Sequence, residues 1–266
     1  MVKIDFRSGI PRDTPLLDNH KEWIDGTEAE PEHMELFRSI TSYEPSKLCG
    51  IKHEPGLQPN SCQRLICPRC APRRAAILQA ELMQRLAANP EAQLFHLTLT
   101  ARLPANGLTA SWDAMQSAFG NESLRKTFSR KTLGVFWADG VMRSSAGVWH
   151  VHRHHVLAVA PDQADKLPSL VTAWLEAAPV YGLAAYSGGQ SLRPIASDNA
   201  YAVFGYVAQQ LSPQHLAGDF MADGPSDLLA RCEYDSDAVL IFHELEAALY
   251  KRRSIGARGV LAKQSE

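Results

Sequence analysis

The sequence predicts an α+β fold, with a central and mostly antiparallel sheet, flanking helices and a small N-terminal zinc-binding module. Two strand-like stretches, 133–143 and 146–159, are separated only by a short polar turn, which favours antiparallel pairing. Helical stretches separate the other strand-like segments. Four of the five cysteines lie together ahead of these elements, between residues 49 and 70.

After the cysteines, the pattern predicts helix, strand, helix, strand, strand, helix, strand and helix. Leu78 and Leu82 recur at helical spacing in the first helix, whereas Leu94 and His96 belong to an alternating strand. The second helix has a weak point at Gly120. In chain order, these elements cover residues 71–89, 92–103, 109–129, 133–143, 146–159, 162–178, 190–196 and 199–211.

The ends of the last predicted helix and the C-terminal region give weaker signals. Ser197 and Asp198 are expected to cap the helix that follows them. Residues 212–236 read as loop, and residues 238–253 combine a strand-like start with a helical end. Shifts in composition divide the chain into a polar, loosely packed arm at 1–45, a cysteine-rich module with its helix at 46–90, and a main domain at 91–266.

Composition is typical of a soluble globular protein, with 45% apolar and 21% charged residues. No apolar run is long enough to cross a membrane, and the N-terminus lacks the apolar stretch of a secretion signal, so we expect a cytoplasmic protein. The net charge of -2 argues against non-specific coating of nucleic acid. Basic clusters at 64–74, 124–131 and 250–263 nevertheless predict a local basic face.

The four clustered cysteines, Cys49, Cys62, Cys67 and Cys70, have the spacing of a structural zinc site. Two thiolates separated by two residues on a tight turn can reach one tetrahedral Zn²⁺, and the earlier pair can complete the shell. His53 could replace one of these cysteines, and scattered reduced thiols are the alternative interpretation. Such a site would contribute folding energy rather than catalysis.

Four histidines occupy the stretch WHVHRHHVLAV. Because side chains alternate on a strand, His150, His152 and His154 share one face, whereas Arg153 and His155 lie on the other. A single histidine on an apolar strand is usually a core residue. Three in alternation predict a site for a divalent ion, because neutral imidazole is a good metal ligand.

The helix predicted at 199–211 offers Tyr201 and Tyr206. Tyrosines on a helix are normally packing residues. A phenol becomes an effective nucleophile only where another group activates it or the phosphate that it attacks.

Taken together, these motifs resemble the HUH endonucleases, and most closely the rolling-circle replication initiators of small bacterial plasmids. The strand LFHLTLT is similar to the first family motif, WHVHRHHVLAV to the histidine motif, and GYVAQQ to the tyrosine motif. The segment CPRCAPRRAAILQAEL resembles the family's cysteine-rich region, and RRSIGARGVLAK its C-terminal pattern. The resemblance implies a ferredoxin- or RRM-like catalytic domain.

The resemblance also implies roles for individual residues. His152 and His154 correspond to the paired metal ligands, with His150 as a third, and Tyr206 corresponds to the nucleophile. The implied reaction is metal-dependent nicking and rejoining of single-stranded or hairpin origin DNA, with Mn²⁺ or Mg²⁺, through a 5′-phosphotyrosine. A host helicase and polymerase are candidate partners in the bacterial cytoplasm. The candidate DNA contacts are Arg64, Arg69, Arg73, Arg74, Arg125, Lys126, Arg130, Lys131, Arg252 and Arg253.

The tyrosine motif departs from the family pattern. Relatives carry lysines beside the tyrosine where this chain has Gly205 and Gln209, and many carry an acid or second tyrosine where it has Ala202. Tyr201 and Gln209 are therefore only candidate auxiliary residues, and the step that ends a replication round is open. The alternatives are an HUH transposase or relaxase, a zinc-bearing origin-binding protein without catalysis, and a small-substrate metal hydrolase.

Overall fold

The computed structural model describes residues 31–51, 61–102, 107–144, 147–211, 222–223 and 225–263. The helices are α3 (Pro31–Ile40), α4 (Glu44–Lys47), α5 (Cys70–Ala87), α6 (Gly107–Gly120), α7 (Glu122–Lys131), α8 (Pro168–Val180), α9 (Ala200–Ala208), α10 (Pro225–Arg231) and α11 (Ser236–Leu249). The strands are β1 (Gln93–Arg102), β2 (Gly134–Ser144), β3 (Trp149–Val159), β4 (Ser191–Ile195), β5 (Ala222–Asp223) and β6 (Ile255–Gly259).

The strands form one antiparallel sheet, as the sequence predicts. The order is β4-β1-β3-β2-β5, and β6 also pairs with β2. The histidine-bearing strand β3 therefore lies in the middle, between β1 and β2. Short β4 lies at an edge of this sheet and carries Pro194, a residue that sheets tolerate mainly at edges.

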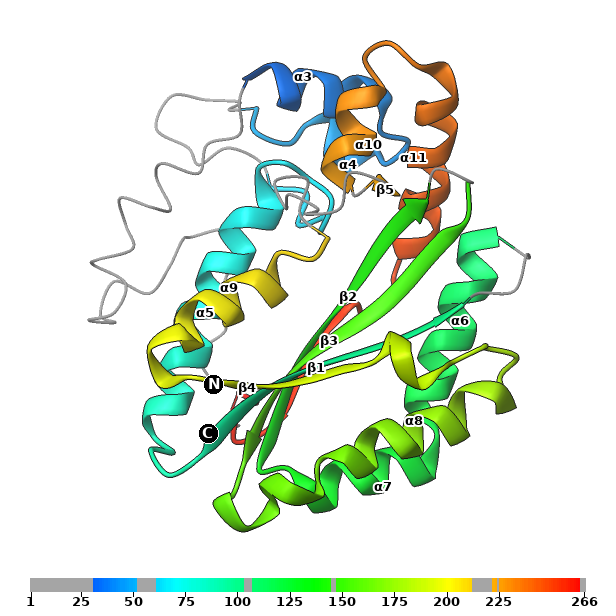
Figure 1. Cartoon of the computed structure of the whole chain (residues 1–266). Helices are drawn as coiled ribbons and strands as arrows, with labels where there is room; N and C mark the ends of the chain where they lie inside the picture. Colours follow the sequence, from blue (N-terminus) through cyan, green and yellow to red (C-terminus); the bar gives the residue numbers. More distant parts are fainter. Residues whose placement is uncertain are drawn as a thin grey trace.

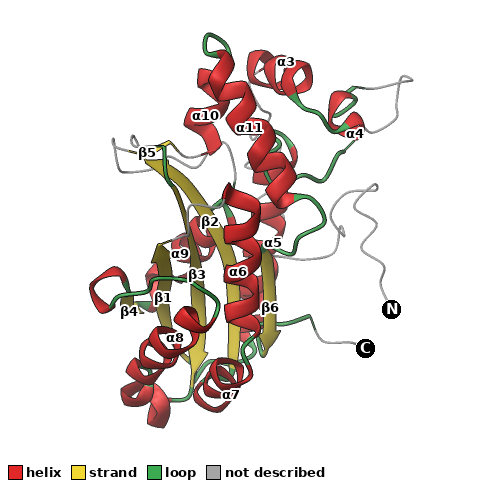
Figure 2. Cartoon of the chain, turned by 90° about the vertical axis from the view of Figure 1, so that its right-hand side faces the viewer, coloured by secondary structure: helices red, strands yellow, loops and turns green. Residues whose placement is uncertain are grey.

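Helices cover both faces of the sheet (Figures 1 and 2). Helices α5 and α9 lie side by side on one face, and α6, α7 and α8 lie on the other. Helices α3, α4, α10 and α11 gather at one end of the sheet, close to the cysteine module. The cysteines belong to the same buried cluster as core residues of the sheet such as Leu97 and Val151, so the module is continuous with the main core.

The predicted weak point in the second helix is confirmed. The chain forms two helices there, and Gly120 ends the first of them. Asn121 then caps α7, because its side chain accepts a hydrogen bond from the Leu124 backbone N–H.

The prediction that Ser197 and Asp198 cap α9 is wrong. These residues form a short 3-10 turn, and Asn199 occupies the N-cap of α9 without a side-chain cap bond. The strand-like start predicted at residue 238 is also wrong, because α11 is helical from Ser236. Asp235 caps it by accepting from the Asp237 N–H, and its buried residues recur at helical spacing, namely Ala238, Phe242, Leu245 and Leu249.

Two segments have more structure than the sequence suggests. Residues 225–231, within the predicted loop, form α10. The loosely packed arm predicted at 1–45 includes α3, whose Met34 and Phe37 are buried; residues 1–30 lie outside the described residues. Among the helices of the described segments, none combines the length and apolar character that a membrane span requires.

Candidate functional site

The histidine face of β3 is the centre of the candidate site. His152 lies opposite Thr100 of β1 and Gly140 of β2, and His154 lies opposite Thr98 and Ala138. The rings of His152 and His154 are nearly perpendicular, with centroids 4.7 Å apart. Both residues are buried, at 8% and 5% exposure, so the sheet holds two imidazoles together away from bulk water.

A glycine on β2 makes room for His152. A Cβ built on Gly140 would lie 2.3 Å from His152 Nε2 and 2.9 Å from Gln210 Oε1. His152 Nε2 and Gln210 Oε1 are themselves 3.4 Å apart. Gln210 follows α9 and also donates to the Tyr206 carbonyl, so it joins the end of α9 to the histidine face.

His154 is oriented by β1. His96 Nε2 lies 2.9 Å from His154 Nδ1, and Thr98 Oγ1 lies 3.1 Å from the same atom. The two rings are only 14° from parallel. Burial, with a smaller effect of Arg193, lowers the pKa of His96 to about 4, so this imidazole is neutral at neutral pH.

His150 is held differently from the other two histidines. Its Nε2 hydrogen-bonds to Thr100 Oγ1, and its ring centroid lies 5.4 Å from that of His152. Burial lowers the pKa of His150, which favours the neutral form that a metal ligand needs.

Tyr206 stands directly beside these rings. Its ring meets that of His154 edge-on at a centroid distance of 5.3 Å and that of His96 at 5.9 Å. Tyr206 is 44% exposed, so it borders the site and still faces solvent. The structure therefore brings together the histidines and the tyrosine that the resemblance pairs.

Packing against α5 explains why this chain has Gly205 where the family pattern has a lysine. A Cβ built there would lie 2.6 Å from Gln79 Nε2, because α5 packs closely against α9. The same Gln79 nitrogen donates to the Tyr201 carbonyl at 2.7 Å. A lysine at position 205 would clash with this contact, so α5 occupies the space beside the tyrosine.

Tyr201 is placed less favourably than Tyr206. Five residues separate the two on α9, so their side chains leave the helix about 140° apart. Burial raises the pKa of Tyr201, which makes its phenolate harder to form. Gln209, the other auxiliary candidate, is half-buried just after the helix, and Ala202 is exposed.

The far face of β3 has a structural role. His155 packs against Phe119 and Phe128, and burial holds its pKa well below the usual value. Arg153 forms a buried ion pair with Asp139, which also accepts from Gln116. The separation of His155 from the other histidines, predicted from strand alternation, is therefore confirmed.

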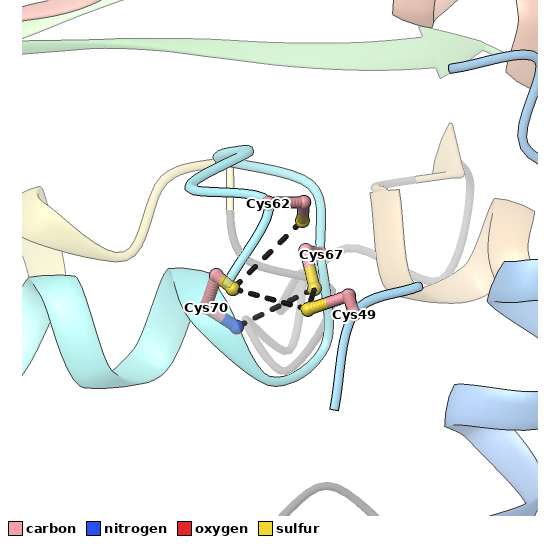
Figure 3. A group of neighbouring side chains, drawn as sticks. All are labelled: Cys49, Cys62, Cys67 and Cys70. Atoms are coloured by element: carbon pink, nitrogen blue, oxygen red, sulfur yellow. Dashed lines mark hydrogen bonds between the residues drawn. The ribbon is translucent and has the colours of Figure 1, made fainter. Parts of the chain in front are cut away.

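The four cysteines converge at one point, as Figure 3 shows. Sγ of Cys49 lies 3.6 Å from that of Cys67 and 3.4 Å from that of Cys70, and Cys62 Sγ lies 3.8 Å from Cys70 Sγ. These distances are too long for disulfides and close to the separation of about 3.8 Å expected for thiolates around one tetrahedral Zn²⁺.

The cysteine group therefore fits a metal ion, consistent with zinc. All four thiols are buried, with every sulfur within 4.8 Å of the others. Four thiols this close without a metal would leave buried sulfurs with only weak partners. His53, considered as a substitute ligand, lies outside the described residues.

The histidine face is a looser donor set. The ligand atoms of the four cysteines all lie within 4.8 Å of one another. Among the described residues, no other group of three or more His, Cys, Asp or Glu side chains is as close. The three histidines alone do not converge in this way. The Gln210 carbonyl oxygen, close to His152, is a further donor that a hard divalent ion accepts.

The candidate DNA contacts are dispersed. Arg125, Lys126, Arg130 and Lys131 belong to α7, on the sheet face opposite Tyr206. Lys126 pairs with Glu122, and Arg252 pairs through two bonds with Asp113. The Arg64 guanidinium donates to the Glu246 carbonyl, and that of Arg253 lies over the Trp137 ring. Arg69 is the N-cap residue of α5, the helix that carries Arg73 and Arg74.

Sequence reasoning missed three residues of the site. Gly140 gives a signal, because a glycine inside a strand often marks the close approach of another group. His96 lies on the predicted same-face row of β1, but its contact with His154 depends on the register between β1 and β3. Gln210 has no sequence signal beyond its place one helical turn after Tyr206.

Residues 57–169 match the family model Rep_1, described as "Replication protein". The matched range includes the histidines of β3 and three of the four clustered cysteines, whereas Tyr206 lies beyond it. No curated protein and no solved structure matches the chain.

Proposed function

We propose that the protein is a rolling-circle replication initiator that nicks and rejoins single-stranded origin DNA through Tyr206, a proposal supported by the match of residues 57–169 to the replication-protein model Rep_1. The observation that carries the proposal is the contact of the Tyr206 ring with His154 and His96. The tyrosine lies outside the matched segment, and its ring lies beside His154 of β3, which is inside that segment.

The reaction is a transesterification. Tyr206 Oη attacks the scissile phosphorus and loses its proton to solvent, and the P–O3′ bond breaks as the leaving 3′-oxygen takes up a proton from solvent. The products are a 5′-phosphotyrosyl link and a free 3′-hydroxyl, which primes synthesis; attack by a 3′-hydroxyl reverses the step and rejoins the strand. The half-exposed position of Tyr206 allows a flexible strand to reach it.

The divalent-ion site is assigned to His152 and His154, with Gln210 as a third donor and His150 as the alternative. The neutral imidazoles can hold Mn²⁺, and the amide oxygen is a ligand that both Mn²⁺ and Mg²⁺ accept; the ion would polarise the phosphoryl oxygens. Because Nδ1 of His154 is engaged by His96 and Thr98, Nε2 is the ring atom that would hold the ion.

Incubating the protein with a labelled single-stranded origin oligonucleotide tests the proposal. We expect an SDS-stable adduct with Mn²⁺ that does not form when no divalent ion is added, and peptide mass spectrometry should place the DNA on Tyr206. Tight origin binding without any adduct would favour instead a zinc-bearing binding protein. An adduct on Tyr201 would show that Tyr201, and not Tyr206, is the nucleophile.

Gly140→Ala should disable the ion site. The added methyl group would overlap His152 Nε2, so the imidazole must move away from Gln210. We expect Mn²⁺ affinity to fall roughly 10- to 100-fold, measured by equilibrium titration, with nicking falling in parallel. Gly120→Ala is the matched control, because nothing lies within 4 Å of its added Cβ. Equal affinity in the two variants would contradict the assignment.

His96 positions His154 rather than touching the substrate. His96→Phe keeps the ring but removes the bond to His154 Nδ1, so we expect a loss of about 10-fold or more in Mn²⁺ affinity. His96→Gln, which retains a hydrogen-bonding group, should recover part of that affinity. If the phenylalanine variant binds Mn²⁺ as well as wild type, Thr98 alone orients His154 and the role of His96 is refuted.

A further inference from the structure

Polar and aromatic side chains line the sheet edge next to the histidine site. Arg193 of β4 lies opposite His96, and Ser191 lies opposite Thr98. Directly paired residues on antiparallel strands share a face, so Arg193 and Ser191 lie on the same face as the histidines. His96 in turn contacts Tyr206, so this row of side chains begins beside the proposed nucleophile.

The row continues past the start of β4. Arg102, at the end of β1, lies opposite His150 and therefore shares its face. The Arg102 guanidinium lies 5.6 Å from the centre of the Tyr186 ring. A Cβ on Gly189 would be 3.1 Å from both Tyr186 and Thr100, which brings the tyrosine ring against this same part of β1.

Tyr186 is exposed but held in place. Its side chain is 49% exposed. The Gln190 side chain donates to the Tyr186 carbonyl at 2.9 Å, donates to the Thr100 carbonyl at 3.0 Å and accepts from the Thr100 N–H at 2.9 Å. A further pair of backbone hydrogen bonds joins Arg102 to Ala184. An exposed aromatic ring on an anchored turn is a ready platform for stacking.

The two arginines of the row differ from several of the basic residues that the sequence singles out. Both are exposed, and among the described residues no ion pair engages either of them. Lys126 and Arg252, by contrast, each pair with an acid. Arg102 and Arg193 are therefore accessible to a ligand from outside the protein.

We infer that Arg102, Tyr186, Ser191 and Arg193, here called the β4 stripe, bind the single DNA strand that flanks the scissile phosphate. The inference rests on the proposed function for the identity of the strand. Tyr186 stacks on a base, Arg102 and Arg193 contact phosphates, and Ser191 donates a hydrogen bond to the backbone. The seven residues from His96 to Arg102 span about 20 Å of β1, enough for several nucleotides.

A single strand fits this stripe better than a duplex. Stacking on Tyr186 requires an unpaired base face, whereas bases within a duplex are already stacked on one another. Basic residues spaced along an edge with an aromatic ring among them are the usual features of single-strand binding. The arrangement also leads toward Tyr206, where the strand must be cut.

Fluorescence anisotropy with labelled oligo(dT), without added Mn²⁺ or Mg²⁺, tests the stripe without cleavage. Tyr186→Ala should weaken binding roughly 5- to 150-fold with an unchanged salt dependence, since it removes stacking but no charge. Arg102→Gln and Arg193→Gln should each lower the slope of log affinity against log salt by about 0.7. The matched controls are Tyr234→Ala, a 78% exposed tyrosine elsewhere, and Lys166→Gln, an exposed cation between β3 and α8.

The outcomes separate the two proposals. Loss of oligo(dT) binding in the stripe variants, with thermal unfolding unchanged, supports the stripe even where wild type forms no adduct. Wild-type binding in all three variants overturns it, even where the protein nicks. An equal loss of affinity for a duplex of the same length would also overturn it, because the residues would then be general phosphate contacts.

Discussion

Tyr206→Phe is expected to abolish the covalent protein–DNA adduct and to reduce nicking by on the order of a thousandfold or more, as loss of a nucleophile does in other enzymes. The substitution removes only the hydroxyl. The ring that contacts His154 and His96 remains, and the side chain is already half exposed, so neither the fold nor Mn²⁺ binding should change. The measurement is adduct formation on SDS gels together with the rate of origin cleavage.

The control within the same helix is Tyr201→Phe. Its side chain leaves α9 on a different side from Tyr206, and we expect it to keep nearly wild-type nicking. If instead Tyr201→Phe abolishes the adduct and Tyr206→Phe retains it, the nucleophile is misassigned. If both variants form the adduct only partially, the two tyrosines substitute for each other.

The antiparallel sheet and the histidine face follow from local patterns in the sequence. Alternation along β3 alone separates His152 and His154 from His155, and the structure places them on opposite faces of the central strand. The same reasoning succeeds for β1, where His96 and Thr98 share a face. The alternation of side chains along a strand is a property of the backbone, so it can be predicted without knowing which strands pair with it.

The remaining parts of the site depend on contacts between distant segments. His96 reaches His154 across 58 residues of chain, and Gln210 reaches His152 across the same separation. Neither contact is visible until the register of the sheet and the position of α9 are fixed. Gly205 shows the same limit, because its meaning depends on Gln79 of a different helix.

Tertiary packing also explains the misread C-terminal helix. The start of α11 has the β-branched residues Val239 and Ile241, which resemble a strand. The helix forms because its buried row packs on the core and because Glu246 accepts hydrogen bonds from Thr41 and Ser42. Burial of one face outweighs a weak local preference.

Cys67→Ser is expected to have the largest effect on stability. It would remove one of four converging thiolates and leave the others close together without a metal, so we expect zinc to be lost. The site lies within the main buried cluster, and the neighbouring Arg64 bonds to the Glu246 carbonyl of α11. Loss of the metal should therefore lower the free energy of unfolding by more than about 4 kcal/mol.

Elemental analysis and denaturant unfolding measure this effect, and Cys232→Ser provides the control. Cys232 is also buried but follows α10, apart from the cluster, and its Sγ donates to the Leu228 carbonyl, a bond that a serine hydroxyl can replace. We expect the control to keep its zinc and most of its stability, and a chelator to reproduce the Cys67→Ser effect in wild type. A Cys67→Ser protein with wild-type zinc content and stability would show that the cysteines serve only as buried packing residues.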